Sequence, residues 1–378
     1  MKPHVLLINV HGGFPSALIG RSLTELESFS HLCRDAVTYE RMYPTNVCAA
    51  PALHDTVMDA PLASLTDNVR HSWGRQRQAT RTIFHLFRQQ GYDTRLYGAY
   101  GLDARLDARA NMKVGVDERQ ALHAHGVDVC ATADTAFADD HAPARDADTL
   151  RRLLDDIEAA NDTGDGGRPR LSMVNLLGCQ DVERFCVGGK FDADAALLPT
   201  LSFDATDDKL DQRQLSKSVL EDDPRRAPGR TPVDALRRLV LLHDSLHGIV
   251  GEKPCDDATV SANVIALHRH CWRVLQRIDD ALLRVVQALH RKGLYKHTNI
   301  YLYSDHAVGL YEHGVTCETP WESCLRCFLV RKSDAIAADT RVVEPISLSE
   351  LPSMIFDDCK IHADWHVKRA PASRACLT

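Results

Sequence analysis

Two residues with metal-binding side chains, Asp305 and His306, follow a short apolar stretch in the C-terminal part of the chain. The stretch, residues 300–303, consists of aliphatic and aromatic residues, as is typical of a buried strand. In open α/β sheets, ligands bind at the edge where the parallel strands end. An adjacent carboxylate and imidazole at that edge would offer an oxygen and a nitrogen ligand to a divalent ion such as Zn2+. Alternatively, Asp305 caps a turn and His306 is an ordinary polar residue.

A third candidate ligand, His11, follows the apolar run at residues 5–10. Such a run is typical of a parallel strand that is buried on both faces of a sheet. Because the carboxyl ends of parallel strands share one edge, we expect His11 to lie on the same edge as Asp305 and His306. The three residues could form a three-ligand Zn2+ site. Alternatively, they are satisfied polar residues that bind no metal.

The elements that would position these residues alternate between helical and strand-like patterns. Apolar spacing predicts helices over residues 23–32, 79–90, 146–160 and 264–289, and strands over residues 94–97 and 171–177. Gly91 and Gly293 lie where two of the helices should end. The repeated alternation predicts an α/β sandwich with a mostly parallel central sheet covered by helices.

Length and composition indicate a soluble globular protein with a large core. The chain has 378 residues, of which 44% are hydrophobic and 26% are charged. We divide it into an α/β core at residues 1–330, with a loop-rich insertion at 188–257, and a short C-terminal subdomain at 331–378. The formal net charge is −7 and the basic residues form no stripe, which argues against a nucleic-acid partner.

The twelve cysteines and the N-terminus bear on the compartment of the protein. Several cysteines lie in helical or strand-like patterns, so we expect reduced thiols; this includes Cys324 and Cys327, whose CxxC spacing fits strand packing. The apolar run at residues 5–10 is too short for a signal peptide, and no run approaches the length of a membrane span. We therefore expect a cytoplasmic protein.

The segment SDHAVGLYEHG, residues 304–314, resembles the SDHG…GEHG signature of the sulfatase branch of the alkaline phosphatase superfamily. Four other segments follow in the order of that family: HVLLINVHGG at His4, TIFHLFRQQGYDTRLYGAYGL at Thr82, WESCLRCFLV at Trp321 and SLSELPSMIF at Ser347. The resemblance implies an alkaline-phosphatase/sulfatase-like fold, a metal bound by Asp305 and the residue after it, and His313 as a neighbour of the site. The chemistry does not follow from the fold alone.

Several positions depart from the chemistry that the resemblance implies. The family uses two adjacent acids after the first strand, an oxidised Cys in CxPxR, and cationic side chains that hold the ester. Here the acids are replaced by His11 and Gly12, and Cys48 is followed by a proline one place late and by no arginine. The family's other cationic positions fall at Ala99, Gly101, near Cys179 and at about Cys317.

Two classes of function compete. The favoured one is a catalytically degenerate sulfatase-like protein, a pseudoenzyme with a binding or structural role and an unknown protein partner or assembly. The alternative is a divergent metal-dependent hydrolase of sulfate or phosphate esters that uses Cys48 or Thr45, with His313 nearby. An anionic ester is the expected ligand in either case.

The expected cofactor is one divalent metal, or none. Two neutral donors and a single carboxylate favour Zn2+ over Ca2+ or Mg2+, which prefer oxygen ligands. A third and weaker interpretation takes the HGG turn at His11 as a nucleotide-binding turn, but GxGxxG and a P-loop lysine are both absent.

Overall fold

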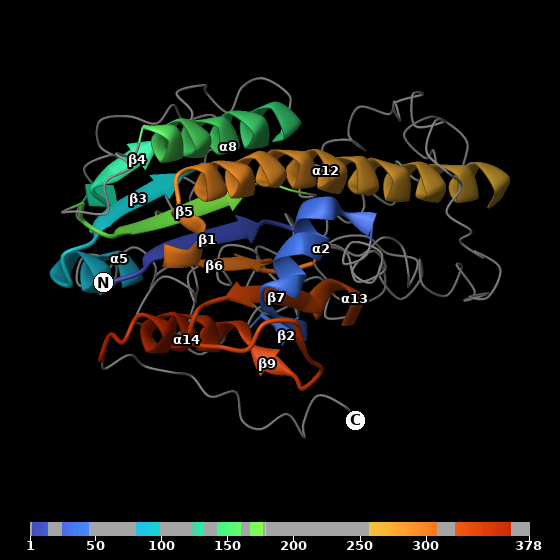
Figure 1. The fold of residues 1–378 in the computed structure, drawn as a ribbon. Helices are drawn as coiled ribbons and strands as arrows, with labels where there is room; N and C mark the ends of the chain where they lie inside the picture. The colour runs from blue at the N-terminus through green and yellow to red at the C-terminus, as the bar shows by residue number, and fades with distance from the viewer. Residues whose placement is uncertain are drawn as a thin grey trace, which may run out of the picture.

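In the residues that it describes, a computed structural model of the chain shows a nine-stranded mixed sheet between two layers of helices (Figure 1). The residues that it describes are 2–13, 25–44, 81–98, 122–123, 126–131, 142–159, 167–176, 178, 257–307 and 322–363. The predicted loop-rich insertion at 188–257 therefore lies almost entirely outside them.

The strands that carry the candidate ligands lie at the centre of this sheet. The strand order is β4-β3-β5-β1-β6-β7-β2-β8, and β9 pairs with β2. All pairs are parallel except those of β7, which is antiparallel to β6 and β2, so the predicted mostly parallel sheet is confirmed. The bounds are β1 (His4–Val10), β2 (Val37–Tyr43), β3 (Asp93–Tyr97), β4 (Val129–Ala131), β5 (Arg170–Leu176), β6 (Thr298–Tyr303), β7 (Cys327–Lys332), β8 (Thr340–Val342) and β9 (Ile346–Ser347).

The central strand β1 is buried on both faces, as its apolar run predicts. Leu6, Ile8 and Val10 pack into one core, and Val5 and Leu7 pack into the other. Side chains alternate between the two faces of a strand, so a strand covered on both sides must be apolar at nearly every position. This double burial keeps β1 and its neighbours in the middle of the sheet.

Two sets of helices cover the two faces. The first core contains residues of α2 (Glu27–Arg34), α8 (Ala142–Glu158) and α12 (Asp257–Arg291), and the second contains residues of α5 (Ile83–Gln89) and α14 (Leu351–Asp358). Figure 1 shows α8 and α12 side by side over one face, with α14 on the other side of the sheet. A single short turn, α13 (Glu322–Leu325), precedes β7. No helix in the described part of the chain is long and apolar enough to cross a membrane.

Helix boundaries differ from the sequence-based ones where capping decides them. The helix expected at residues 79–90 begins at Ile83, because Thr82 and His85 form a capping box at its start. The helix expected at 23–32 begins at Glu27, where a side chain of another helix, Asp279, accepts hydrogen bonds from the backbone. The helix expected at 264–289 is 35 residues long.

The C-terminal part of the described chain adds strands to the same sheet. β7 spans residue 330, and both β8 and β9 pair with β2. The division into a core and a C-terminal subdomain stays a prediction. Cys33, Cys130, Cys271, Cys327 and Cys359 form no disulfide bond in the described part of the chain.

Candidate metal site

The structure brings His11, Asp305 and His306 together at the carboxyl ends of β1 and β6. These strands are adjacent and parallel, with Asn9 opposite Tyr303, so the residues that follow them emerge side by side. The His11 N–H extends the pairing with β5 by donating to the carbonyl of Leu176, 2.8 Å away. The potential ligand atoms of the three residues all lie within 4.8 Å of one another.

The Asp305 carboxylate joins the two imidazoles. One oxygen, Oδ2, lies 2.5 Å from Nδ1 of His11, and the other, Oδ1, lies 3.0 Å from Nδ1 of His306. Oδ1 also accepts a hydrogen bond of 3.0 Å from the backbone N–H of His306. The two rings are 4.8 Å apart between centroids and meet edge to face. Asp305 is therefore the central member of the cluster.

The cluster is almost completely shielded from solvent. Asp305 is 0% exposed, His306 1% and His11 7%. Burial alone would raise the pKa of the Asp305 carboxyl, but the charges and hydrogen bonds of His11 and His306 hold that pKa well below its ordinary value. Asp305 is consequently ionised. An imidazole that donates through Nδ1 and has given up its other proton carries a lone pair on Nε2, the atom that a metal could bind.

The donor set fits a borderline divalent metal. Metal ligands must be deprotonated, and the ionised Asp305 meets that condition although it is buried. Two imidazoles and one carboxylate are the ligand types that Zn2+ binds, and three protein ligands are typical of catalytic rather than structural zinc sites. His11, Asp305 and His306 are the residues that would hold it.

A close approach of two chain segments shapes the site. A Cβ atom on Gly13 would overlap the Oγ and Cβ atoms of Ser304 and would lie 2.9 Å from the carbonyl of Val10. The Ser304 hydroxyl donates to the carbonyl of His306 and so closes the turn that contains Asp305. Only glycine at position 13 allows the segment after β1 to pack this closely on the segment after β6.

Two further groups support the site, and sequence patterns did not single them out. The side chains of Asn9 and Asn175 are hydrogen-bonded to each other, and Asn9 also contacts the backbone of Asp305. Asp146 of α8 accepts a hydrogen bond of 2.9 Å from the N–H of Gly178, which packs against the backbone of His11. Asn9 and Asn175 could have been found from the sequence only as polar residues inside two otherwise buried strands.

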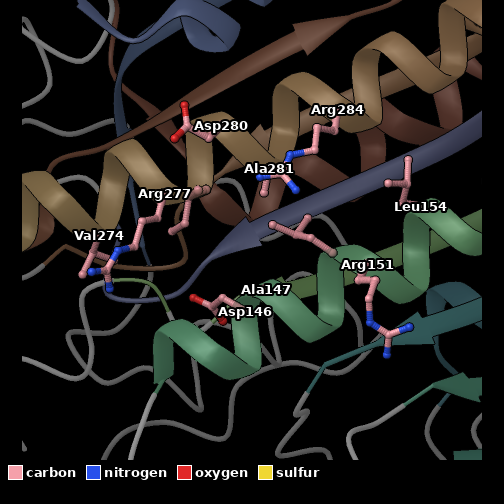
Figure 2. Close-up of a pocket in the computed structure, with 11 residues that line it drawn as sticks. Asp146, Ala147, Arg151, Leu154, Val274, Arg277, Asp280, Ala281 and Arg284 are labelled. Carbon is pink, nitrogen blue, oxygen red and sulfur yellow. The ribbon is translucent and has the colours of Figure 1, made fainter.

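A groove of about 390 Å³ lies between α8 and α12. Figure 2 shows Arg277 and Arg284 of α12 along one wall and Arg151 and Leu154 of α8 along the other. Asp146 lies at one end of the groove and connects it to the site through its hydrogen bond to Gly178. The groove contains none of the candidate ligands.

Several residues with predicted roles lie outside the described part of the chain. They are Thr45, Cys48, Ala99, Gly101, Cys179, His313 and Cys317. Their roles stay predictions.

Comparison with known proteins agrees with this architecture. The sulfatase family model matches residues 14–358, and the chain belongs to the sulfatase family. The predicted family resemblance and the predicted fold class are therefore confirmed. A comparison with curated protein sequences finds no match.

Solved structures share the fold at low sequence identity. A phosphonate monoester hydrolase from Silicibacter pomeroyi is 16% identical with a TM-score of 0.62, over 95% of this chain and 73% of that one. The phosphonate monoester hydrolase of Agrobacterium radiobacter is 13% identical with a TM-score of 0.59, over 97% and 75%. A protein solved with its substrate D-glucosamine-2-N,6-O-disulfate is 13% identical with a TM-score of 0.57, over 97% and 78%. At these sequence identities, the comparison shows that the fold is shared and nothing more.

Proposed function

We propose that this protein is a divergent metal-dependent hydrolase of sulfate or phosphate esters, with His11, Asp305 and His306 as its metal ligands. The observation that supports this most is the convergence of two imidazoles and an ionised carboxylate, all buried, at the edge of the sheet where α/β proteins bind ligands. Membership of the sulfatase family supplies the substrate class.

Zn2+ is the metal that the donors favour. The three residues offer two neutral nitrogen ligands and one negative charge, whereas Ca2+ and Mg2+ prefer a shell of oxygen ligands. A bound Zn2+ would supply Lewis acidity toward the oxygen of an ester. The protein's own part is to keep Asp305 ionised, hold the two imidazoles against it and exclude bulk water from all three.

The nucleophile would come from a segment that the structure does not describe. The sequence offers Cys48 and Thr45 for this role, with His313 as a further candidate catalytic residue. The Cys48 segment lacks the proline in register and the arginine of CxPxR, so an unmodified thiol or hydroxyl would have to act.

A second candidate function has its own observation. Ala99, Gly101 and Cys317 stand where the family has cationic or imidazole side chains. Removing one charge-stabilising group from such a site typically costs about 2–4 kcal/mol of transition-state stabilisation. On this basis the protein would be a pseudoenzyme that retains the metal and an anionic ligand for a binding or structural role within a larger assembly.

Metal content and turnover, measured on one preparation, separate the two candidates. The assay determines bound zinc by mass spectrometry and follows hydrolysis of 4-nitrophenyl sulfate and 4-nitrophenyl phosphate. We expect zinc and a rate that disappear together in Asp305→Ala and persist in Asp334→Ala, which removes an exposed aspartate elsewhere. Zinc without turnover would favour the pseudoenzyme. A protein with no bound zinc, and a rate that survives in Asp305→Ala, would refute the site.

A further inference from the structure

Two buried asparagines lie one residue before the ends of neighbouring strands. Asn9 of β1 and Asn175 of β5 are register partners, and the two residues are 0% and 5% exposed. Burying an amide is unfavourable unless its hydrogen-bonding groups are satisfied. The preceding register pair, Ile8 and Val174, is apolar and has no such requirement. The asparagine pair therefore calls for a reason other than packing.

The hydrogen bonds of Asn9 show what the pair does. Its Oδ1 accepts from the backbone N–H of Asp305 at 3.1 Å, and its Nδ2 donates to Oδ1 of Asn175 at 2.7 Å. A backbone N–H can only donate, so Asn9 must present its oxygen to Asp305 and its NH2 group to Asn175. The orientation of the Asn9 amide thus follows from chemistry.

This hydrogen-bonded chain holds Asp305 beyond the end of its own strand. β6 ends at Tyr303, so the Asp305 N–H lies outside the strand and takes its acceptor from the Asn9 side chain. The direction of the main chain at Asp305 determines where its carboxylate points, and that carboxylate contacts both His11 and His306. A displaced main chain would separate the ligands.

We propose that Asn9 is a positioning residue that aims the Asp305 carboxylate, and that Asn175 fixes the amide of Asn9. The effect on metal affinity rests on the proposed function. The effect on the contact between His11 and Asp305 does not, because that contact joins two side chains of the protein.

Four variants test the role. Asn9→Leu and Asn175→Leu replace each amide by an apolar side chain of similar size, whereas Asn9→Asp keeps an acceptor for the Asp305 N–H. Asn299→Leu is the matched control, because Asn299 is also a buried asparagine, lies on β6 and contacts Cys359 instead of the cluster. If Asn9→Leu does not fold, Asn9→Ser replaces it, because serine is smaller and polar and also removes the contact. The results expected for Asn9→Leu then apply to Asn9→Ser.

Two measurements are made on each variant. The first, in metal-free protein, is the far-downfield proton NMR signal of the imidazole N–H between His11 and Asp305, assigned by its loss in Asp305→Ala. The second is zinc affinity, determined by competition with a chromophoric chelator. We expect Asn9→Leu to shift or abolish the signal and to weaken zinc binding by about 10- to 100-fold, as for other residues that orient metal ligands. Asn175→Leu should act in the same direction with a smaller effect.

The control variants show which results would contradict the proposal. Asn9→Asp keeps the acceptor for the Asp305 N–H but loses the donor to Asn175, so it should retain more of the signal and the affinity than Asn9→Leu. Asn299→Leu should leave both unchanged even if it lowers thermal stability. A wild-type signal and affinity in Asn9→Leu would overturn the proposal, as would equal losses in Asn299→Leu. If the wild-type protein takes up no zinc, the proposed function fails, and the NMR signal alone decides whether Asn9 positions Asp305.

Discussion

Replacing Gly13 by alanine should disturb both the stability of the chain and its candidate metal site. The added Cβ would overlap Oγ and Cβ of Ser304 and would approach the Val10 carbonyl to 2.9 Å. Rotation of the Ser304 side chain could move its Oγ but not its Cβ, so the main chain beside Asp305 has to shift. Overpacking of this kind costs about 1–3 kcal/mol, and loss of the hydrogen bond from Ser304 to His306 adds about 1 kcal/mol.

We therefore expect Gly13→Ala to lower the free energy of unfolding by about 2–4 kcal/mol, a large share of the stability of a typical domain. Gly167→Ala is the control, because no heavy atom beyond its chain neighbours lies within 4 Å of the place that its Cβ would occupy. That variant should change the free energy of unfolding by less than about 0.5 kcal/mol. Chemical denaturation measures both differences, and zinc competition should show weaker binding in Gly13→Ala alone.

A double variant identifies the cause. Ser304→Gly removes the atoms that the new Cβ would overlap, so Gly13→Ala with Ser304→Gly should cost at least about 1 kcal/mol less than the sum of the two single changes. The contact with the Val10 carbonyl remains, and full recovery is not expected. Equal destabilisation by Gly13→Ala and Gly167→Ala would refute the steric reasoning, and so would strict additivity in the double variant.

Three other predictions concern the scaffold and the nucleophile segment. Asp279→Ala removes the acceptor of the Ser28 and Phe29 N–H groups at the start of α2, at 3.2 and 3.0 Å, and should cost about 1–2 kcal/mol in chemical denaturation while zinc binding is unchanged. Burial, followed by the charges of Arg170 and His297, lowers the pKa of His4, so the unfolded chain binds this proton more readily. The free energy of unfolding should then fall as the pH drops through the ordinary histidine range, and it should fall less in His4→Asn; an identical pH dependence would contradict this. Cys48 should remain a thiol, because its segment lacks CxPxR, and a mass loss of about 18 Da in its peptide, the thiol-to-aldehyde change, would show otherwise.

Local patterns in the sequence were sufficient for the central strands and the long helices. The run at residues 5–10 corresponds to β1 (His4–Val10), and the run at 300–303 corresponds to β6 (Thr298–Tyr303). Burial on both faces requires apolar residues at consecutive positions, which makes such strands recognisable without their partners. The apolar stripe at 264–289 likewise indicated α12, because its spacing reflects one buried face.

The edge of the sheet was not predictable in this way. β2 (Val37–Tyr43) mixes charged and aromatic residues, and only some of them are buried. Its pairing with β7 shifts register between Tyr39 and Met42, and its other partners, β8 and β9, come from residues 340–347. A strand of this kind is stabilised by its neighbours, and contacts between distant segments leave little trace in local periodicity.

For the candidate site, too, the sequence indicated some features and the tertiary structure decided the others. The sequence determined which side chains could bind a metal, because Asp305, His306 and His11 each follow an apolar strand pattern. Their contact was decided by the order and register of the sheet, which brings together residues 294 positions apart. The pairing of Asn9 with Asn175, 166 positions away, and the close approach of Gly13 to Ser304 depend on that register too. A shift of one residue in a strand turns every side chain to the opposite face, so these contacts exist only in the folded sheet.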